Sequence, residues 1–245
     1  MTISVFTYAN KPEIRDQIDI LSKTSWPEFL LHGNIYHWDY LFDLFPEYQV
    51  LLCDPEDTLL GVGHSVPIHW SGSLSNLPRT IEEILLRAEK VHVKEQMSNT
   101  ISAVAAMVRP EHRGKNISTR IIQEMKILVK QNSCTSLIAP VRPIWKSRYP
   151  LSPMERYINW KQIDGSPFDP WIRVHWRMGA IPLCIAPNTL TVDGDIQEWE
   201  NWTQMVFPDS GLYVIPGGLQ PVKIDREQNK GVYKDPNYWM KHLAE

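Results

Sequence analysis

Residues 100–129 read TISAVAAMVRPEHRGKNISTRIIQEMKILV, and this stretch decides the fold. Its first part, Ile101 to Val108, is an unbroken run of apolar and small residues of strand length, which Pro110 ends. Apolar residues then recur at helical spacing; they are Ile117, Ile121, Ile122, Met125 and Leu128. The stretch therefore predicts a buried strand, a short turn and an amphipathic helix.

The turn between this strand and this helix is basic and contains a glycine. It comprises Arg113, Gly114, Lys115, Asn116, Ile117 and Ser118. The first N–H groups of a helix have no partner within it and lie at the positive end of its dipole, so they attract anions. Gly114 lets a ligand approach the backbone, and Arg113 and Lys115 add positive charge. The pattern favours a pyrophosphate-binding loop, although an ordinary surface turn can show the same short motif.

Residues 108–118 resemble the acyl-coenzyme A (acyl-CoA) loop of the GCN5-related N-acetyltransferase (GNAT) superfamily. The family pattern is Arg or Gln, two residues, Gly, one residue, then Gly or Ala, and this chain has Arg113, Asn116 and Ser118 there. Asn tolerates a left-handed backbone better than other non-glycine residues, and Ser is common at helix starts. The resemblance implies that acyl-CoA, as acetyl-CoA or another acyl-CoA co-substrate, is bound here. The implied contacts are Met107, Val108, Arg109, Arg113, Gly114, Lys115, Asn116, Ile117 and Ser118.

The order of the predicted elements agrees with the resemblance. Strands are expected at 3–8, 48–54, 58–70, 101–108, 135–142, 180–192, 212–216 and 222–225, and helices at 11–21, 26–45 in two pieces, 78–90, 117–130, 169–179 and 195–204. The implied fold is α/β, a GNAT fold with a mixed, mostly antiparallel central sheet flanked by helices. Its central strands splay apart so that pantetheine lies between them.

Main-chain groups beside that gap are expected to bind the thioester. The residues concerned are Met107 and Arg109, whose N–H and C=O groups would pair with pantetheine amides and polarise the thioester carbonyl. Pro140 suits the opposite strand, because proline donates no ladder hydrogen bond.

A helix beginning near residue 170 carries the candidate catalytic residue. Asp169 can cap it, Pro170 suits its first position and Gly179 can end it. In the superfamily this helix commonly ends in Tyr, three residues and Gly, and the Tyr protonates the departing CoA thiolate. This chain has His175 in place of the Tyr, and histidine can transfer that proton. The structural alternative is a packed, hydrogen-bonded histidine.

Residues 138–160 and 164–175 are similar to a bacterial subgroup that includes the acetyltransferase-like loading domains of polyketide biosynthesis. The similarity continues through 198–202, 211–216 and 236–242. In loading domains, a helix histidine and a hydroxyl residue near the preceding strand end are associated with malonyl decarboxylation. His175 matches the histidine, whereas Val141 and Ile144 are aliphatic. This departure favours acyl transfer over decarboxylation.

Cations and tryptophans are concentrated in residues 142–177, where the acceptor is expected to bind. The candidate substrate-binding residues are Arg142, Trp145, Trp171 and Arg173. The cations suit an acidic small molecule or the phosphopantetheine arm of an acyl carrier protein. Internal ion pairing and a structural aromatic core are the alternatives.

Length and composition favour a single GNAT-type domain over residues 1–245 with an extended C-terminal segment. The net charge is −3, so nucleic acid is not an expected partner. Three cysteines without metal-binding spacing suggest reduced thiols and no metal. No signal peptide and no run of about 20 apolar residues is found, so a cytoplasmic protein without a membrane partner is expected.

The combined expectation is an acyl-CoA-dependent acyltransferase. It would move an acetyl or short acyl group to a small-molecule amine or to the thiol of an acyl carrier protein. Two alternatives remain: a malonyl-thioester decarboxylase of the polyketide-loading type, and a domain that binds CoA or a carrier protein without turnover.

Overall fold

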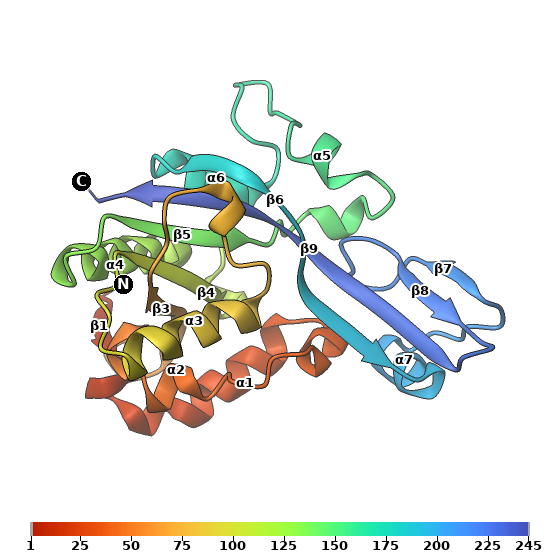
Figure 1. The fold of residues 1–245 in the computed structure, drawn as a ribbon, viewed down its shortest axis with the longest axis horizontal. Coiled ribbons are helices and arrows are strands. Elements are labelled where there is room, and N and C mark those ends of the chain that lie inside the picture. Colours follow the sequence, from red (N-terminus) through yellow and green to blue (C-terminus); the bar gives the residue numbers. More distant parts are fainter. Residues whose placement is uncertain (1, 245) are drawn as a thin grey trace.

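The computed structural model describes residues 2–244, whose strands form one mixed sheet (Figure 1). The strand order is β1-β2-β3-β4-β5-β9-β8-β7, and β6 also pairs with β9. The strands are β1 (Ser4–Thr7), β2 (Gln49–Cys53), β3 (Leu59–Ile68), β4 (Thr100–Val108), β5 (Ser136–Val141), β6 (Ile181–Gly194), β7 (Gly211–Tyr213), β8 (Val222–Asp225) and β9 (Lys230–Leu243). Only β4 and β5 pair in parallel among these strands. The expected mixed, mostly antiparallel sheet is confirmed.

Helices cover both faces of the sheet. They are α1 (Arg15–Ser25), α2 (Tyr40–Asp43), α3 (Ile81–Val93), α4 (Ile117–Gln131), α5 (Met154–Tyr157), α6 (Pro170–Arg177) and α7 (Ile196–Thr203). Helix α4 lies close against β3, because a Cβ added at Gly63 would be 2.4 Å from Ile121 Cγ2. The neighbouring residue His64 points to the opposite face and contacts Phe42 of α2. Helices α1 to α3 therefore lie on the face opposite α4 (Figure 1).

Long strands extend the fold into a C-terminal arm, which we define as residues 188–234. Here β6 and β9 run beyond the central strands and, with β7, β8 and α7, enclose a second hydrophobic core (Figure 1). This core is centred on Phe29, Trp199 and Tyr233, and it is separate from the main core beneath α4. The arm thus has packing of its own.

Strand β9 is the main element that the sequence patterns do not predict. It contains Asp235, Pro236 and Asn237, and these residue types are depleted in strands. The structure accommodates them at an irregularity, because the register of β9 with β6 shifts beside Pro236. Proline is tolerated at such bulges. The pairing of β9 with neighbouring strands on both of its edges therefore outweighs the low strand preference of these residues.

The predicted helix at 11–21 also begins later than expected. Pro12 to Ile14 form a 3₁₀ turn, and the α-helix starts at Arg15.

In the described part of the chain, no helix has the length and apolar character needed to span a bilayer. Residues 2–244 also contain no cluster of three or more His, Cys, Asp or Glu side chains suited to a metal ion.

Candidate active site

The two central strands separate partway along their length. Strand β4 pairs with β5 only through Thr100–Ser102 and Ser136–Ile138, so the rest of each strand diverges. Residues 103–106 of β4 remain partly exposed although the strand is central. Pro140 lies in the diverging part of β5, as expected. The result is a gap with an unpaired strand edge on each side.

The register of β3 and β4 decides which amides face this gap. Arg109 N–H donates to Leu60 O at 2.9 Å, which turns the Arg109 amide toward β3 and away from the gap. Hydrogen bonding alternates along an antiparallel strand, so Met107 also faces β3. The groups that can bind pantetheine are therefore those of Ala106 and Val108. Sequence reasoning chose Met107 and Arg109 because strand parity cannot be read without the register.

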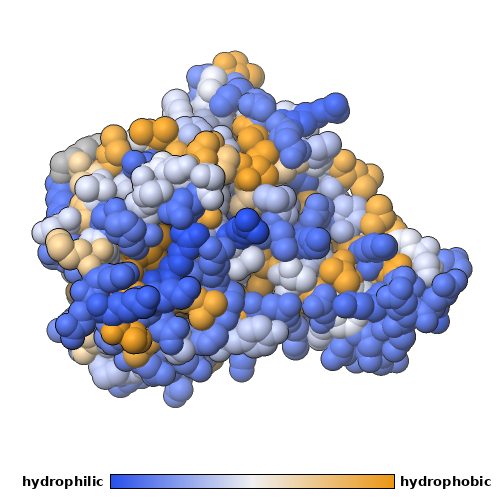
Figure 2. Space-filling view, viewed as in Figure 1, coloured by the Kyte–Doolittle hydropathy of each residue, from blue (hydrophilic) through white to orange (hydrophobic). Residues whose placement is uncertain are grey.

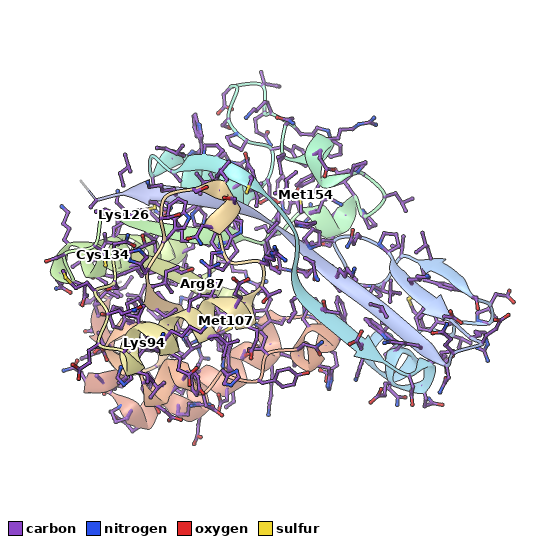
Figure 3. The ribbon with its side chains drawn as sticks, in the orientation of Figure 1. Arg87, Lys94, Met107, Lys126, Cys134 and Met154 are labelled. Carbon is purple, nitrogen blue, oxygen red and sulfur yellow. The ribbon has the colours of Figure 1, made fainter. Side chains whose placement is uncertain are left out.

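The side chains of those two residues are also held within the protein. Met107, labelled in Figure 3, is 2% exposed and packs in the main core. The Arg109 guanidinium donates to Leu59 O and, at 3.4 Å, to Gln17 Oε1 of α1. Neither side chain points freely into the gap.

The basic turn leads from β4 into α4 with the backbone that anion binding requires. Asn116 is the N-cap of α4 and has φ +62°, in the left-handed region. Its side chain makes no capping hydrogen bond, and the N–H groups of Ile117, Ser118 and Thr119 find no acceptor within residues 2–244. A Cβ added at Gly114 would meet nothing within 4 Å. These unpaired amides, together with Arg113 and Lys115, can hold a diphosphate.

His175 lies at the buried end of α6. Asp169 caps this helix through Trp171 N–H and Ile172 N–H, and Gly179, with φ +78°, follows its last turn. His175 is 3% exposed, and its Nδ1 lies 2.9 Å from Nε2 of His242 in β9. Its own Nε2 has no hydrogen-bond partner in the described chain.

Burial, and secondarily the nearby His242, hold the pKa of His175 well below its ordinary value. The ring is therefore neutral near pH 7. The sequence argument assumed an unperturbed pKa near neutrality, and burial changes that premise. His242 was not selected as a site residue, although it ends the segment 236–242 that carries part of the resemblance.

The four candidate acceptor residues lie in different environments. Arg142 Nε is paired with Asp235 Oδ1 and Oδ2 at 3.1 and 2.9 Å, and its Nη2 donates to Gly217 O. Arg173 donates to the main-chain oxygens of Pro167 and Phe168. Both guanidinium groups therefore bind internal partners, which matches the structural alternative.

The two tryptophans differ in their position relative to His175. Trp145 packs edge-on against Phe168, with ring centroids 5.4 Å apart, and Arg148 lies over its ring at 5.0 Å. Trp171 contacts the ring of His175, with centroids 4.5 Å apart. Of the four candidates, only Trp171 adjoins the histidine.

The surface polarity differs between regions on the face drawn in Figure 2. Hydrophilic side chains dominate the lower part, over α1 to α3 and the C-terminal arm. Hydrophobic side chains gather in the upper part, near α5 and β6.

Comparison with known proteins finds one similar sequence and several similar structures. No protein-family model matches the chain. The arginine N-acetyltransferase avaD of Aspergillus versicolor is 28% identical over 89% of this chain and 84% of that protein. The loading GNAT-like domain of CurA from Lyngbya majuscula has a TM-score of 0.68 at 18% identity, covering 100% of this chain and 98% of that domain. The chain therefore has the GNAT fold and resembles a GNAT-type N-acetyltransferase in sequence.

A second GNAT structure shows the same architecture. The GphF GNAT-like decarboxylase, solved in complex with isobutyryl-CoA, has a TM-score of 0.61 at 12% identity and covers 100% of both chains. The predicted resemblance to GNAT proteins and the predicted fold are confirmed. The expected acetyltransferase class and the expected use of acyl-CoA agree with these GNAT relatives.

Proposed function

We propose that this protein is an acyl-CoA-dependent N-acetyltransferase that transfers an acetyl or short acyl group from CoA to a small-molecule amine. The observation that carries the proposal is the continuity of two features. The unpaired edge of β4 at Ala106 and Val108 is followed in the chain by the unpaired amides at the start of α4. Pantetheine suits the first feature, and a diphosphate suits the second.

The reaction forms a C–N bond and breaks a C–S bond. An N–H group on the β4 edge polarises the thioester carbonyl, and donors of this kind contribute roughly 3 kcal/mol each to rate enhancement. The neutral amine attacks the carbonyl carbon and becomes positively charged in the tetrahedral intermediate. One of its protons must reach the departing thiolate.

His175 is suited to carry that proton. Its Nε2 is buried and unpaired, and the low pKa means that the ring begins neutral. Nitrogen and sulfur are bonded to the same carbon in the intermediate, so one imidazole nitrogen can take the proton from nitrogen and pass it to sulfur. Trp171 packs on the ring and fixes its orientation.

An amine acceptor is supported by the avaD relative, whose name specifies arginine. Decarboxylation and transfer to a carrier-protein thiol are second candidates, favoured by the likeness to the CurA loading domain. Against decarboxylation, Val141 is 2% exposed and packs with Ile172 and Ala180 in an apolar cluster. The buried members of that cluster carry no hydroxyl group, and the hydroxyl residue that packs against it, Tyr238, comes from β9 and not from the end of β5.

The test combines calorimetry with an assay of thiol release. Acetyl-CoA should bind the wild-type protein, and L-arginine or another amine should increase thiol release. His175→Ala should lower kcat by about 10²- to 10⁴-fold with little change in the Kd for acetyl-CoA, because the histidine acts on the proton. His69→Ala, at an exposed histidine, is the matched control.

Three results would redirect the proposal. Absence of acetyl-CoA binding would contradict the proposed acyl-CoA site. Carbon dioxide release from malonyl-CoA, without amine-dependent thiol release, would favour the decarboxylase. An unchanged kcat in His175→Ala would exclude the histidine as proton carrier.

A further inference from the structure

A second buried histidine lies on the other face of the sheet. His64 of β3 is 0% exposed and points toward the helices α1 to α3. Its ring meets Trp38 and Phe42 edge-on, with centroids 5.4 and 5.6 Å away. His64 has no place in the proton transfer assigned to His175.

The neighbouring Gln49 fixes the tautomer of His64. Gln49 Nε2 donates to the main-chain oxygens of Phe45 and Ser65 at 2.7 and 3.0 Å. Carbonyl oxygens only accept, so the orientation of the amide is determined. Gln49 Oε1 then faces His64 Nδ1 at 3.0 Å, and Nδ1 must carry the proton. Nε2 is left with an unprotonated lone pair.

This lone pair lacks a partner. Nε2 of His64 is buried and forms no hydrogen bond with any residue in 2–244. Burial, with a smaller contribution from the Arg15 charge, lowers the pKa of His64 to about 3, so the ring stays neutral at physiological pH. Buried polar atoms in folded proteins are almost always hydrogen-bonded. A ligand with a donor group would satisfy the atom.

His64 lies opposite a residue of β4 that borders the gap. His64 pairs with Ala105 of β4, and residues directly opposite in antiparallel strands lie on the same face about 5 Å apart. Ala105 is partly exposed. The register also shifts between His64 and Ser65, which marks a bulge in β4 at the point where it leaves β5. Bulges occur frequently next to active sites.

We propose that Nε2 of His64 accepts a hydrogen bond from an N–H group of the amine acceptor and holds its nitrogen toward the thioester in the gap. The inference rests on the proposed function and deepens it by assigning the acceptor side. The acceptor enters from the face of α1 to α3, between Trp38 and Ala105. A neutral histidine that can only accept favours amines, because a thiol is a weak donor.

Two substitutions separate this role from a structural one. His64→Asn places an amide N–H where Nδ1 donates to Gln49, and it removes the acceptor at the Nε2 position. His64→Gln does the reverse, because its terminal amide reaches the Nε2 position and leaves Gln49 without a partner. His64→Asn tests whether the acceptor at the Nε2 position binds the amine. His64→Gln tests whether the hydrogen bond to Gln49 matters for the structure.

The kinetic experiment uses acetyl-CoA with L-arginine, tyramine and glycine as probes, and follows the amine with the fastest thiol release. His64→Asn should raise the KM of that amine by about tenfold, the effect of one lost hydrogen bond. The Kd for acetyl-CoA should stay within about twofold of wild type, because the loop of Arg113 to Ser118 is untouched. In His64→Gln, the KM of that amine should return most of the way to the wild-type value. An unchanged KM in His64→Asn would overturn the assignment.

A second measurement does not depend on turnover. In protein labelled with ¹⁵N-histidine, the His64 spectrum should show a protonated Nδ1 and an unprotonated Nε2 at pH 7. Titration with the same amines should shift the Nε2 resonance. A protonated Nε2, or no shift with any of the amines, would contradict the inference even if acetyl-CoA binds normally. Loss of acetyl-CoA binding by wild type would instead count against the proposed function.

Discussion

At the scale of single residues, Asn116 carries the departure from the GNAT loop pattern. The pattern has glycine where this chain has Asn116, and the structure holds it at φ +62° and ψ 13°. A left-handed backbone costs an ordinary residue roughly 1–2 kcal/mol, and asparagine less. The side chain is exposed and forms no capping hydrogen bond. The backbone required by the loop is therefore kept at a modest cost in stability.

Replacing Asn116 by glycine should therefore stabilise the protein. We expect Asn116→Gly to raise the free energy of unfolding by ~0.5–1 kcal/mol, and Asn116→Val to lower it by ~1–2 kcal/mol. Urea denaturation measures both effects. Asn132→Gly is the control, because Asn132 has φ −98° and its side chain bonds Tyr48 and Leu128, so this change should destabilise. A loss of stability in Asn116→Gly would show that the asparagine side chain has an unrecognised role.

At the scale of elements, one buried carboxylate orients helix α6. Asp169 Oδ1 accepts hydrogen bonds from the N–H groups of Trp171 and Ile172. Its Oδ2 accepts hydrogen bonds from Trp145 N–H and Tyr157 O–H, both at 2.8 Å. The same side chain thus starts the helix and fixes two segments of the Pro-dense region around it. His175 follows six positions later on this helix, so its placement depends on Asp169.

Changing this carboxylate should affect stability and turnover together. Asp169→Asn replaces one acceptor oxygen with a donor that faces two donors, and should lower the free energy of unfolding by ~2–4 kcal/mol. Tyr157→Phe removes only one of the four hydrogen bonds and should cost ~1 kcal/mol. In the folded Asp169→Asn protein, kcat should fall more than acetyl-CoA affinity. Equal losses in the two variants would show that the carboxylate is not the organising group.

At the scale of the whole molecule, the proposed acyl-CoA site and the C-terminal arm rest on different cores. The arm packs around Trp199, and Gly231 of β9 allows that ring to approach: an added Cβ would be 2.2 Å from Trp199 Cδ1. The loop and the gap depend on the core beneath α4. The pair of Arg142 and Asp235 links β5 to β9 at the boundary between these regions.

A substitution in the arm should therefore leave acyl-CoA binding intact. Gly231→Ala forces the Trp199 ring to move and should destabilise the arm by ~1–3 kcal/mol. Hydrogen exchange should increase in β7, β8 and α7, while β4 and α4 stay protected and the Kd for acetyl-CoA is unchanged. Gly211→Ala is the matched control, because its Cβ would meet nothing closer than 3.8 Å. A parallel loss of protection in α4 would mean that the two cores unfold together.

Much of the fold was predictable because its signals are local. The strand and helix of residues 100–129, the strands β2 and β3, and the cap of α6 follow from periodicity and terminal residues. The left-handed backbone at Asn116 was anticipated from the residue type. The turn of Arg113 to Ser118 leads into a helix and His175 lies in a helix, as expected, while their roles in binding and catalysis stay predictions.

The sequence by itself determined which segments become strands and helices, and which turn can hold a diphosphate, because those properties depend on neighbours along the chain. Only the tertiary structure decided that β9 is a strand, that Ala106 and Val108 face the gap, and that His64 and His175 are neutral. These properties depend on register and burial, which arise when distant segments pack together. The residue pattern of a single segment therefore does not predict these properties.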